Sequence, residues 1–130
     1  MNTKLIMGAS AIFLGSVGIF ITFAPEAILG YLCLEMNNTS YLFAQILGAL
    51  YFAFGMLNWM SKASLMGGIY NRPIAVANFS HFFIAGLALA KGIASNSNLP
   101  SSIWAIGIIY FIFALSFGLI LFKHPIEKKL

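Results

Sequence analysis

The sequence predicts an all-α integral membrane protein in which four transmembrane helices form an antiparallel bundle. Hydrophobic residues make up 61% of the 130 residues and charged residues only 8%, against about 25% charged residues in ordinary globular domains. A soluble domain of this length could not bury so much apolar surface, because small domains leave a large share of their area exposed. In a membrane, lipid covers the apolar surface that a small domain cannot bury. We therefore expect a single transmembrane domain over residues 1–130.

Four apolar stretches have the roughly 20 residues that a helix needs to cross the hydrocarbon of a bilayer. They run from about residue 5 to 23, 41 to 60, 73 to 92 and 102 to 122. The chain lacks the ten-residue segments of alternating polarity that are typical of membrane β-barrels. The four stretches are therefore predicted to be helices.

The connection after the first span is expected to contain a short helix lying in the membrane interface. Pro25 suits the first turn of a helix, and Glu26 complements the positive N-terminal end of the helix dipole. Apolar residues follow on the next turns, as in helices that lie on a membrane surface.

The distribution of Lys and Arg predicts that both termini are cytoplasmic. Six basic residues then lie on the inner side: Lys4, Lys62, Arg72, Lys123, Lys128 and Lys129. Only Lys91 lies toward the outer side, together with Glu26 and Glu35. Cytoplasmic loops carry an excess of Lys and Arg, so this orientation is strongly favoured over its inverse.

Small and polar residues form a stripe along each span, at the three- and four-residue steps that bring side chains to one face of a helix. The stripes are Gly8, Ala11, Gly15, Gly18 and Thr22; Gln45, Gly48, Phe52, Gly55 and Trp59; Asn78, His81, Ala85, Ala88 and Gly92; and Gly107, Phe111, Ala114 and Gly118. Membrane helices associate where small residues let backbones approach and where polar groups pair. We expect these faces to meet in the bundle.

Five polar residues are candidate ligand-binding residues because polar side chains inside a membrane are costly. They are His81, Asn78, Asn58, Arg72 and Gln45. His81 lies eight residues after Pro73, roughly 12 Å into its span and near the midplane of the bilayer. We expect Asn58, Asn78 and His81 to cluster, with Arg72 at the inner mouth. In the competing interpretation, Asn78 and His81 only bridge helices and Arg72 only anchors the chain at the head groups.

Several function classes lack their residues in this chain. The two histidines, His81 and His124, cannot supply a bis-histidine haem site or a three-ligand zinc site within one chain, so no metal site is predicted. All three acidic residues lie outside the spans, and no catalytic residues are identified. The net charge of +4 is scattered between apolar runs, so nucleic acid is not an expected partner.

The layout resembles the broad group of small four-helix DoxX-like membrane proteins and related bacterial families. The resemblance rests on Phe-Ala-Pro-Glu after the first span, Gln-Ile-Leu-Gly-Ala-Leu-Tyr-Phe-Ala-Phe-Gly in the second, Arg-Pro opening the third and a glycine-rich fourth. Some DoxX-like proteins are associated with quinone-linked oxidoreductase complexes. The resemblance therefore implies a bacterial inner membrane and admits quinone as a cofactor.

Three functions remain open on this basis. The first hypothesis is a non-catalytic, multi-pass inner-membrane protein that binds a lipid-like molecule or a partner membrane subunit. The second is a quinone-linked redox subunit or enzyme that uses His81. The third is a small transporter formed by a homo-oligomer. Membrane lipids are expected partners in each case.

Overall fold

The protein is all-helical over the residues that the computed structural model describes, 2–64, 69–96 and 98–122. The elements are α1 (Thr3–Phe23), α2 (Pro25–Tyr31), α3 (Asn38–Ser61), the short 3-10 helix η1 (Ile69–Asn71), α4 (Arg72–Ser95) and α5 (Ser101–Phe122). Within these ranges, four helices are long and apolar enough to cross a membrane: α1, α3, α4 with η1, and α5. The predicted all-α fold with four such helices is confirmed, and each end lies within three residues of its predicted position.

Local sequence explains where several helices begin. The Oδ1 atoms of Asn2 and Asn37 accept hydrogen bonds from the backbone N–H groups of Leu5 (3.2 Å) and Ser40 (2.8 Å), which caps α1 and α3. Pro25 opens α2 with Glu26 in its first turn, so the predicted short helix after the first span is present. Its place in a membrane interface stays a prediction.

The chain divides into two compact units, which are described separately: an N-terminal hairpin up to residue 63 and a C-terminal hairpin from residue 64 onward. The N-terminal hairpin consists of α1, α2 and α3, and the C-terminal hairpin consists of η1, α4 and α5. A single four-helix bundle over residues 1–130 stays a prediction.

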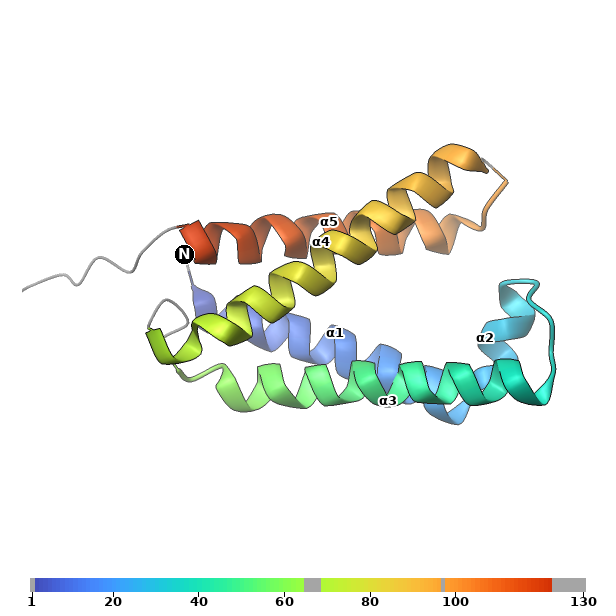
Figure 1. Cartoon of the computed structure of the whole chain (residues 1–130), viewed down its shortest axis with the longest axis horizontal. Coiled ribbons are helices and arrows are strands. Elements are labelled where there is room, and N and C mark those ends of the chain that lie inside the picture. The colour runs from blue at the N-terminus through green and yellow to red at the C-terminus, as the bar shows by residue number, and fades with distance from the viewer. Residues whose placement is uncertain (1, 65–68, 97, 123–130) are drawn as a thin grey trace, which may run out of the picture. The chain divides into compact units, whose positions relative to one another are not determined.

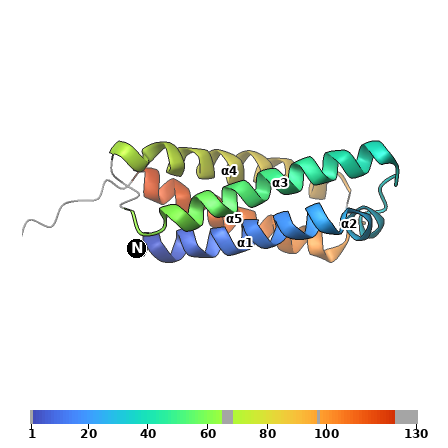
Figure 2. The same ribbon diagram turned by 90° about the horizontal axis from the view of Figure 1, so that it is seen from below.

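Glycines bring the two long helices of the N-terminal hairpin into backbone contact (Figures 1 and 2). A Cβ atom added to Gly18 would lie 2.7 Å from the carbonyl oxygen of Gly48, which is shorter than real Cβ contacts. Gly48 meets Thr22 in the same way. Gly55, later in α3, meets Gly15, earlier in α1, so α1 and α3 are antiparallel. The predicted stripes of both helices are confirmed at these positions.

Several members of the predicted stripes lie differently, and Gln45, Ala88, Gly92 and Phe111 are exposed. Gly8 has no atom within 4 Å of an added Cβ, so α1 and α3 do not approach closely there. Phe52 contributes its backbone to the contact with Gly18, while its side chain is 43% exposed. Trp59 is also exposed, and its ring lies 2.9 Å from the Nζ atom of Lys62. A cation over an indole face, at the end of a span, is typical of a head-group anchor.

Aromatic side chains fill the contact between the two helices of the C-terminal hairpin. The fully buried Phe82 of α4 lies 4.8 Å from Phe113 and 5.7 Å from Phe117 of α5, between ring centroids. Gly118 of α5 meets the ring of Phe79, where an added Cβ would lie 3.3 Å away. A glycine against a side chain leaves the backbones further apart than a glycine against a backbone, so this hairpin is more open than the N-terminal one.

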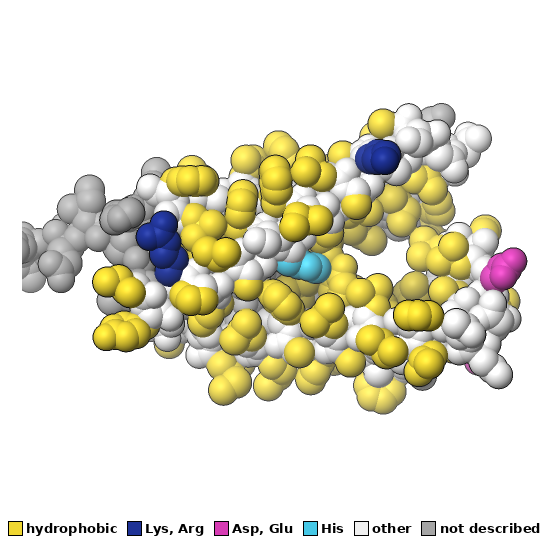
Figure 3. All heavy atoms as spheres, viewed as in Figure 1, with side chains coloured by type: hydrophobic (Ala, Val, Ile, Leu, Met, Phe, Trp, Pro, Cys, Tyr) yellow, Lys and Arg dark blue, Asp and Glu magenta, His cyan; other side chains and the backbone are white. Residues whose placement is uncertain are grey.

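Charged residues separate to opposite ends of the N-terminal hairpin. Lys4 and Lys62 flank the start of α1 and the end of α3, whereas Glu26 and Glu35 lie at the α2 end. Hydrophobic side chains cover most of the helices between the charged groups (Figure 3). Lys123, His124, Lys128 and Lys129 lie outside the described residues. The cytoplasmic placement of the termini therefore stays a prediction.

Candidate functional site

His81 of α4 forms a hydrogen-bonded pair with Tyr110 of α5. The Nε2 atom of His81 on α4 lies 3.2 Å from the hydroxyl oxygen of Tyr110 on α5. His81 is half-buried, and Tyr110 is only 2% exposed. An imidazole can accept the phenol proton or donate its own, depending on its tautomer. The pair is therefore able to hold a proton between two helices in apolar surroundings.

Aromatic rings enclose this pair on one side. The ring of Phe82 stands edge-on to both partners, 5.1 Å from His81 and 5.2 Å from Tyr110 between centroids. Such edge-to-face contacts stabilise aromatic pairs beyond the area that they bury. The position of the imidazole is thus fixed by a hydrogen bond and by ring packing.

Asn78 is fully buried one turn before His81, and its Nδ2 atom donates a 2.9 Å hydrogen bond to the carbonyl oxygen of Ile74. This bond lies within α4. The two residues share a helix face, as their spacing of three predicts.

Asn58 belongs to a different polar group, in the N-terminal hairpin. Its Nδ2 atom donates a 3.0 Å hydrogen bond to the Oγ atom of Ser10, which in turn donates a 2.9 Å bond to the carbonyl oxygen of Met7. Asn58 and Ser10 are both fully buried. The structure thus joins Asn58 to Ser10 across α1 and α3, and its clustering with Asn78 and His81 stays a prediction.

The two remaining candidates are exposed. Arg72 is the first residue of α4, nine residues or about 14 Å along the axis from His81. Gln45 is exposed on α3, thirteen residues or about 20 Å along the axis from Asn58. Arg72 therefore does not reach His81, and Gln45 does not reach Asn58.

Sequence reasoning missed Ser10 and Tyr110 as polar partners. Ser10 lies in an Ala-Ser-Ala segment, which is typical of a helix-packing face. A serine hydroxyl can also form its hydrogen bond within its own helix, so the sequence gives no sign of a partner on another helix. Tyr110 offered a usable signal: a phenol placed eight residues or more from either end of an apolar helix needs a hydrogen-bond partner.

An apolar groove of about 840 Å³ runs along the C-terminal hairpin. Its lining extends from Phe79 to Ala94 on α4 and from Trp104 to Phe122 on α5, and its described lining residues are apolar or glycine. Phe82 lines the groove and also contacts His81 and Tyr110. The fifteen residues between Phe79 and Ala94 correspond to about 22 Å, most of the roughly 30 Å hydrocarbon thickness of a bilayer.

Among the described residues, no three His, Cys, Asp or Glu side chains gather where they could hold a metal ion. Comparison of the chain with known protein families, with curated proteins and with solved structures finds no match. The resemblance to DoxX-like proteins stays a prediction.

Proposed function

We propose that the protein is a multi-pass membrane protein that binds the hydrocarbon chain of a lipid-like molecule in the groove between α4 and α5. The observation that carries this proposal is the uniform lining of the groove, which is apolar on both helices over about 22 Å. Ligand sites have volumes of about 300–1,000 Å³, and 840 Å³ falls in this range.

A groove lined by apolar side chains on two helices is complementary to an acyl or isoprenoid chain, which would lie in it along its length.

A quinone is the second candidate, favoured by the position of Phe82. This ring lines the groove and packs against the hydrogen-bonded pair of His81 and Tyr110. An isoprenoid chain in the groove would bring a quinone head within a side chain's length of two groups that can exchange a proton. This geometry supports a quinone-linked redox role for His81 as the second candidate.

The membrane setting is part of the same proposal. We place the protein in a bacterial inner membrane with both termini cytoplasmic, which agrees with Lys4 and Lys62 lying at one end of the N-terminal hairpin and the acidic residues at the other. The four helices then form one antiparallel bundle of the DoxX-like kind, in which Asn58, Asn78 and His81 approach one another and Arg72 lies at the inner head groups. Gln45 is then available to a partner membrane subunit or to a second copy.

Replacing a small lining residue by a large one tests the proposal. Ala90 lines the groove, whereas Ala88 of the same helix is exposed outside it. Ala90→Trp should lower the amount of lipid or quinone that copurifies with the protein several-fold, because the indole occupies the space of the chain. Ala88→Trp should retain the wild-type amount.

Native mass spectrometry of the purified full-length protein gives the retained molecules, and a melting curve in the same detergent shows that both variants are folded. Equal retention in the two folded variants would contradict the proposal. Retention of a quinone that Ala90→Trp abolishes would support the second candidate.

A further inference from the structure

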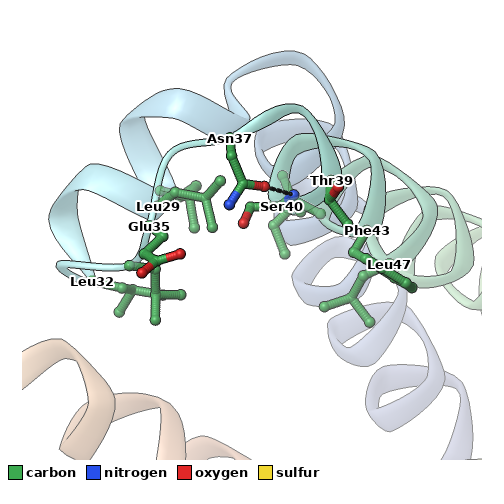
Figure 4. Close-up of a pocket in the computed structure, with 12 residues that line it drawn as sticks. Leu29, Leu32, Glu35, Asn37, Thr39, Ser40, Phe43 and Leu47 are labelled. Carbon is green, nitrogen blue, oxygen red and sulfur yellow. Dashed lines mark hydrogen bonds between the residues drawn. The ribbon is translucent and has the colours of Figure 1, made fainter.

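The N-terminal hairpin contains a second pocket, of about 710 Å³, formed where α2 folds back beside the ends of α1 and α3. Figure 4 shows its lining, which comes from α2, the α2–α3 connection, the first turns of α3 and Ile21 of α1. Unlike the groove of the C-terminal hairpin, this pocket is lined by both polar and apolar side chains.

The polar lining residues of the pocket gather at the α2–α3 connection and the first turn of α3. Glu35, Asn37, Thr39 and Ser40 lie there beside leucines of α2 and the connection, whereas Phe43 and Leu47 lie further along α3. The ten residues from Asn37 to Leu47 correspond to about 15 Å, half of the roughly 30 Å hydrocarbon thickness. The α3 wall of the pocket thus has the length of one lipid chain in one leaflet and is polar at one end.

The charge of the polar end points to a cation. Among the described lining residues, Glu35 is the one with a charged side chain. The basic residues Lys4 and Lys62 flank the opposite end of the hairpin. A negatively charged head group would be repelled by Glu35, whereas an ammonium group would pair with its carboxylate.

The backbone positions Glu35 through an unusual turn. The amides of Cys33 and Leu34 donate to the carbonyl oxygens of Gly30 (3.1 Å) and Leu29 (2.9 Å), which ends α2 in a Schellman motif. The left-handed position of this motif, usually a glycine, is Cys33 with φ 54°. A side chain in this conformation costs free energy, and the reversal it produces turns Leu34 and Glu35 back to line the pocket.

We propose that this pocket binds a membrane lipid whose head group carries an ammonium ion, with the ammonium at Glu35 and one hydrocarbon chain along Phe43 and Leu47. The site is separate from the groove of the C-terminal hairpin and does not depend on it. The described lining of that groove carries no charged side chain, so a head-group preference that is lost in Glu35→Gln would come from this pocket.

Lipid competition on the full-length protein tests the head-group contact. The probes are phosphatidylethanolamine, its N-acetylated form and phosphatidylglycerol, all with the same acyl chains, measured by native mass spectrometry. The wild-type protein should prefer phosphatidylethanolamine over both other lipids by about two- to fivefold, the range of an exposed ion pair. Glu35→Gln should abolish this preference, and Glu26→Gln, an exposed acid of α2 outside the described lining, should keep it.

Photocrosslinking tests where the chain lies. A phosphatidylethanolamine with a diazirine on its acyl chain should label residues 25–47, and Ala44→Trp should remove this labelling. Ala44 lines the pocket, whereas the matched Ala49→Trp lies outside its lining and should leave the labelling unchanged.

An unchanged head-group preference in Glu35→Gln, or an absence of cross-links in residues 25–47, would overturn this proposal. Cross-links confined to residues 79–122 would do the same while supporting the groove of the C-terminal hairpin. If Ala90→Trp loses labelling at residues 79–122 and keeps labelling at residues 25–47, the result would support both proposals.

Discussion

Gly55 of α3 lies against the backbone of Gly15 of α1: a Cβ atom added to Gly55 would be 2.7 Å from the amide nitrogen of Gly15. The neighbours of this contact are backbone atoms, which cannot rotate away as a side chain can. Close backbone approach of this kind is how membrane helices gain packing energy without a hydrophobic driving force between them.

Gly55→Ala should therefore lower the free energy of unfolding by about 1–3 kcal/mol, the usual cost of overpacking. Gly8→Ala is the matched control, because an added Cβ at Gly8 meets no atom within 4 Å. Removing a helical glycine there should raise the stability by about 0.5–1 kcal/mol. Melting temperatures in detergent measure both changes, and a shift of the same sign in both variants would show that the backbone contact does not stabilise the hairpin.

The hydrogen bond between Asn58 and Ser10 should be measurable as a coupling between α1 and α3. Asn58→Ala and Ser10→Ala, alone and combined, form a double-mutant cycle. We expect a coupling of about 0.6 kcal/mol and not above about 1.7 kcal/mol, the range found for hydrogen bonds between membrane helices. Additive effects of the two changes would mean that the bond adds nothing to stability.

Tyr110→Phe and His81→Gln separate packing from ligand binding at the aromatic pair. Tyr110→Phe removes the hydroxyl but keeps the ring against Phe82, and His81→Gln retains a side chain that can form hydrogen bonds. If the pair only joins helices, each change should cost about 1–2 kcal/mol with the same copurifying lipids. Loss of a bound quinone at an unchanged melting temperature would assign a ligand role to His81. Native mass spectrometry and melting curves on the same samples distinguish these results.

Accessibility labelling tests the orientation of the chain. In a Cys33→Ser background, Asn38→Cys should react with an impermeant thiol reagent added to intact cells, whereas Ser64→Cys should react only after the membrane is opened. Both positions are exposed: Asn38 is the first residue of α3, and Ser64 follows three residues after the last residue of α3. The reverse pattern would invert the topology and contradict the interpretation of the Lys and Arg distribution.

Much of the secondary structure was predictable from the sequence, because helix length and polarity are local properties. A span needs about 20 apolar residues, and Pro25 followed by Glu26 marks a helix start wherever it occurs. The glycines at positions 15, 18, 48 and 55 could also be assigned to a packing face, since their spacing places them on one side of each helix.

Only the tertiary structure decided which polar residues meet. The hydrogen bonds of Asn58 to Ser10 and of His81 to Tyr110 were not predicted, because neither Ser10 nor Tyr110 was among the candidate residues, and the clustering of Asn58 with Asn78 stays a prediction. Periodicity tells which residues share a face of one helix. It does not tell the rotation and register at which that face meets a neighbour, because these depend on how all the side chains in the contact fit together.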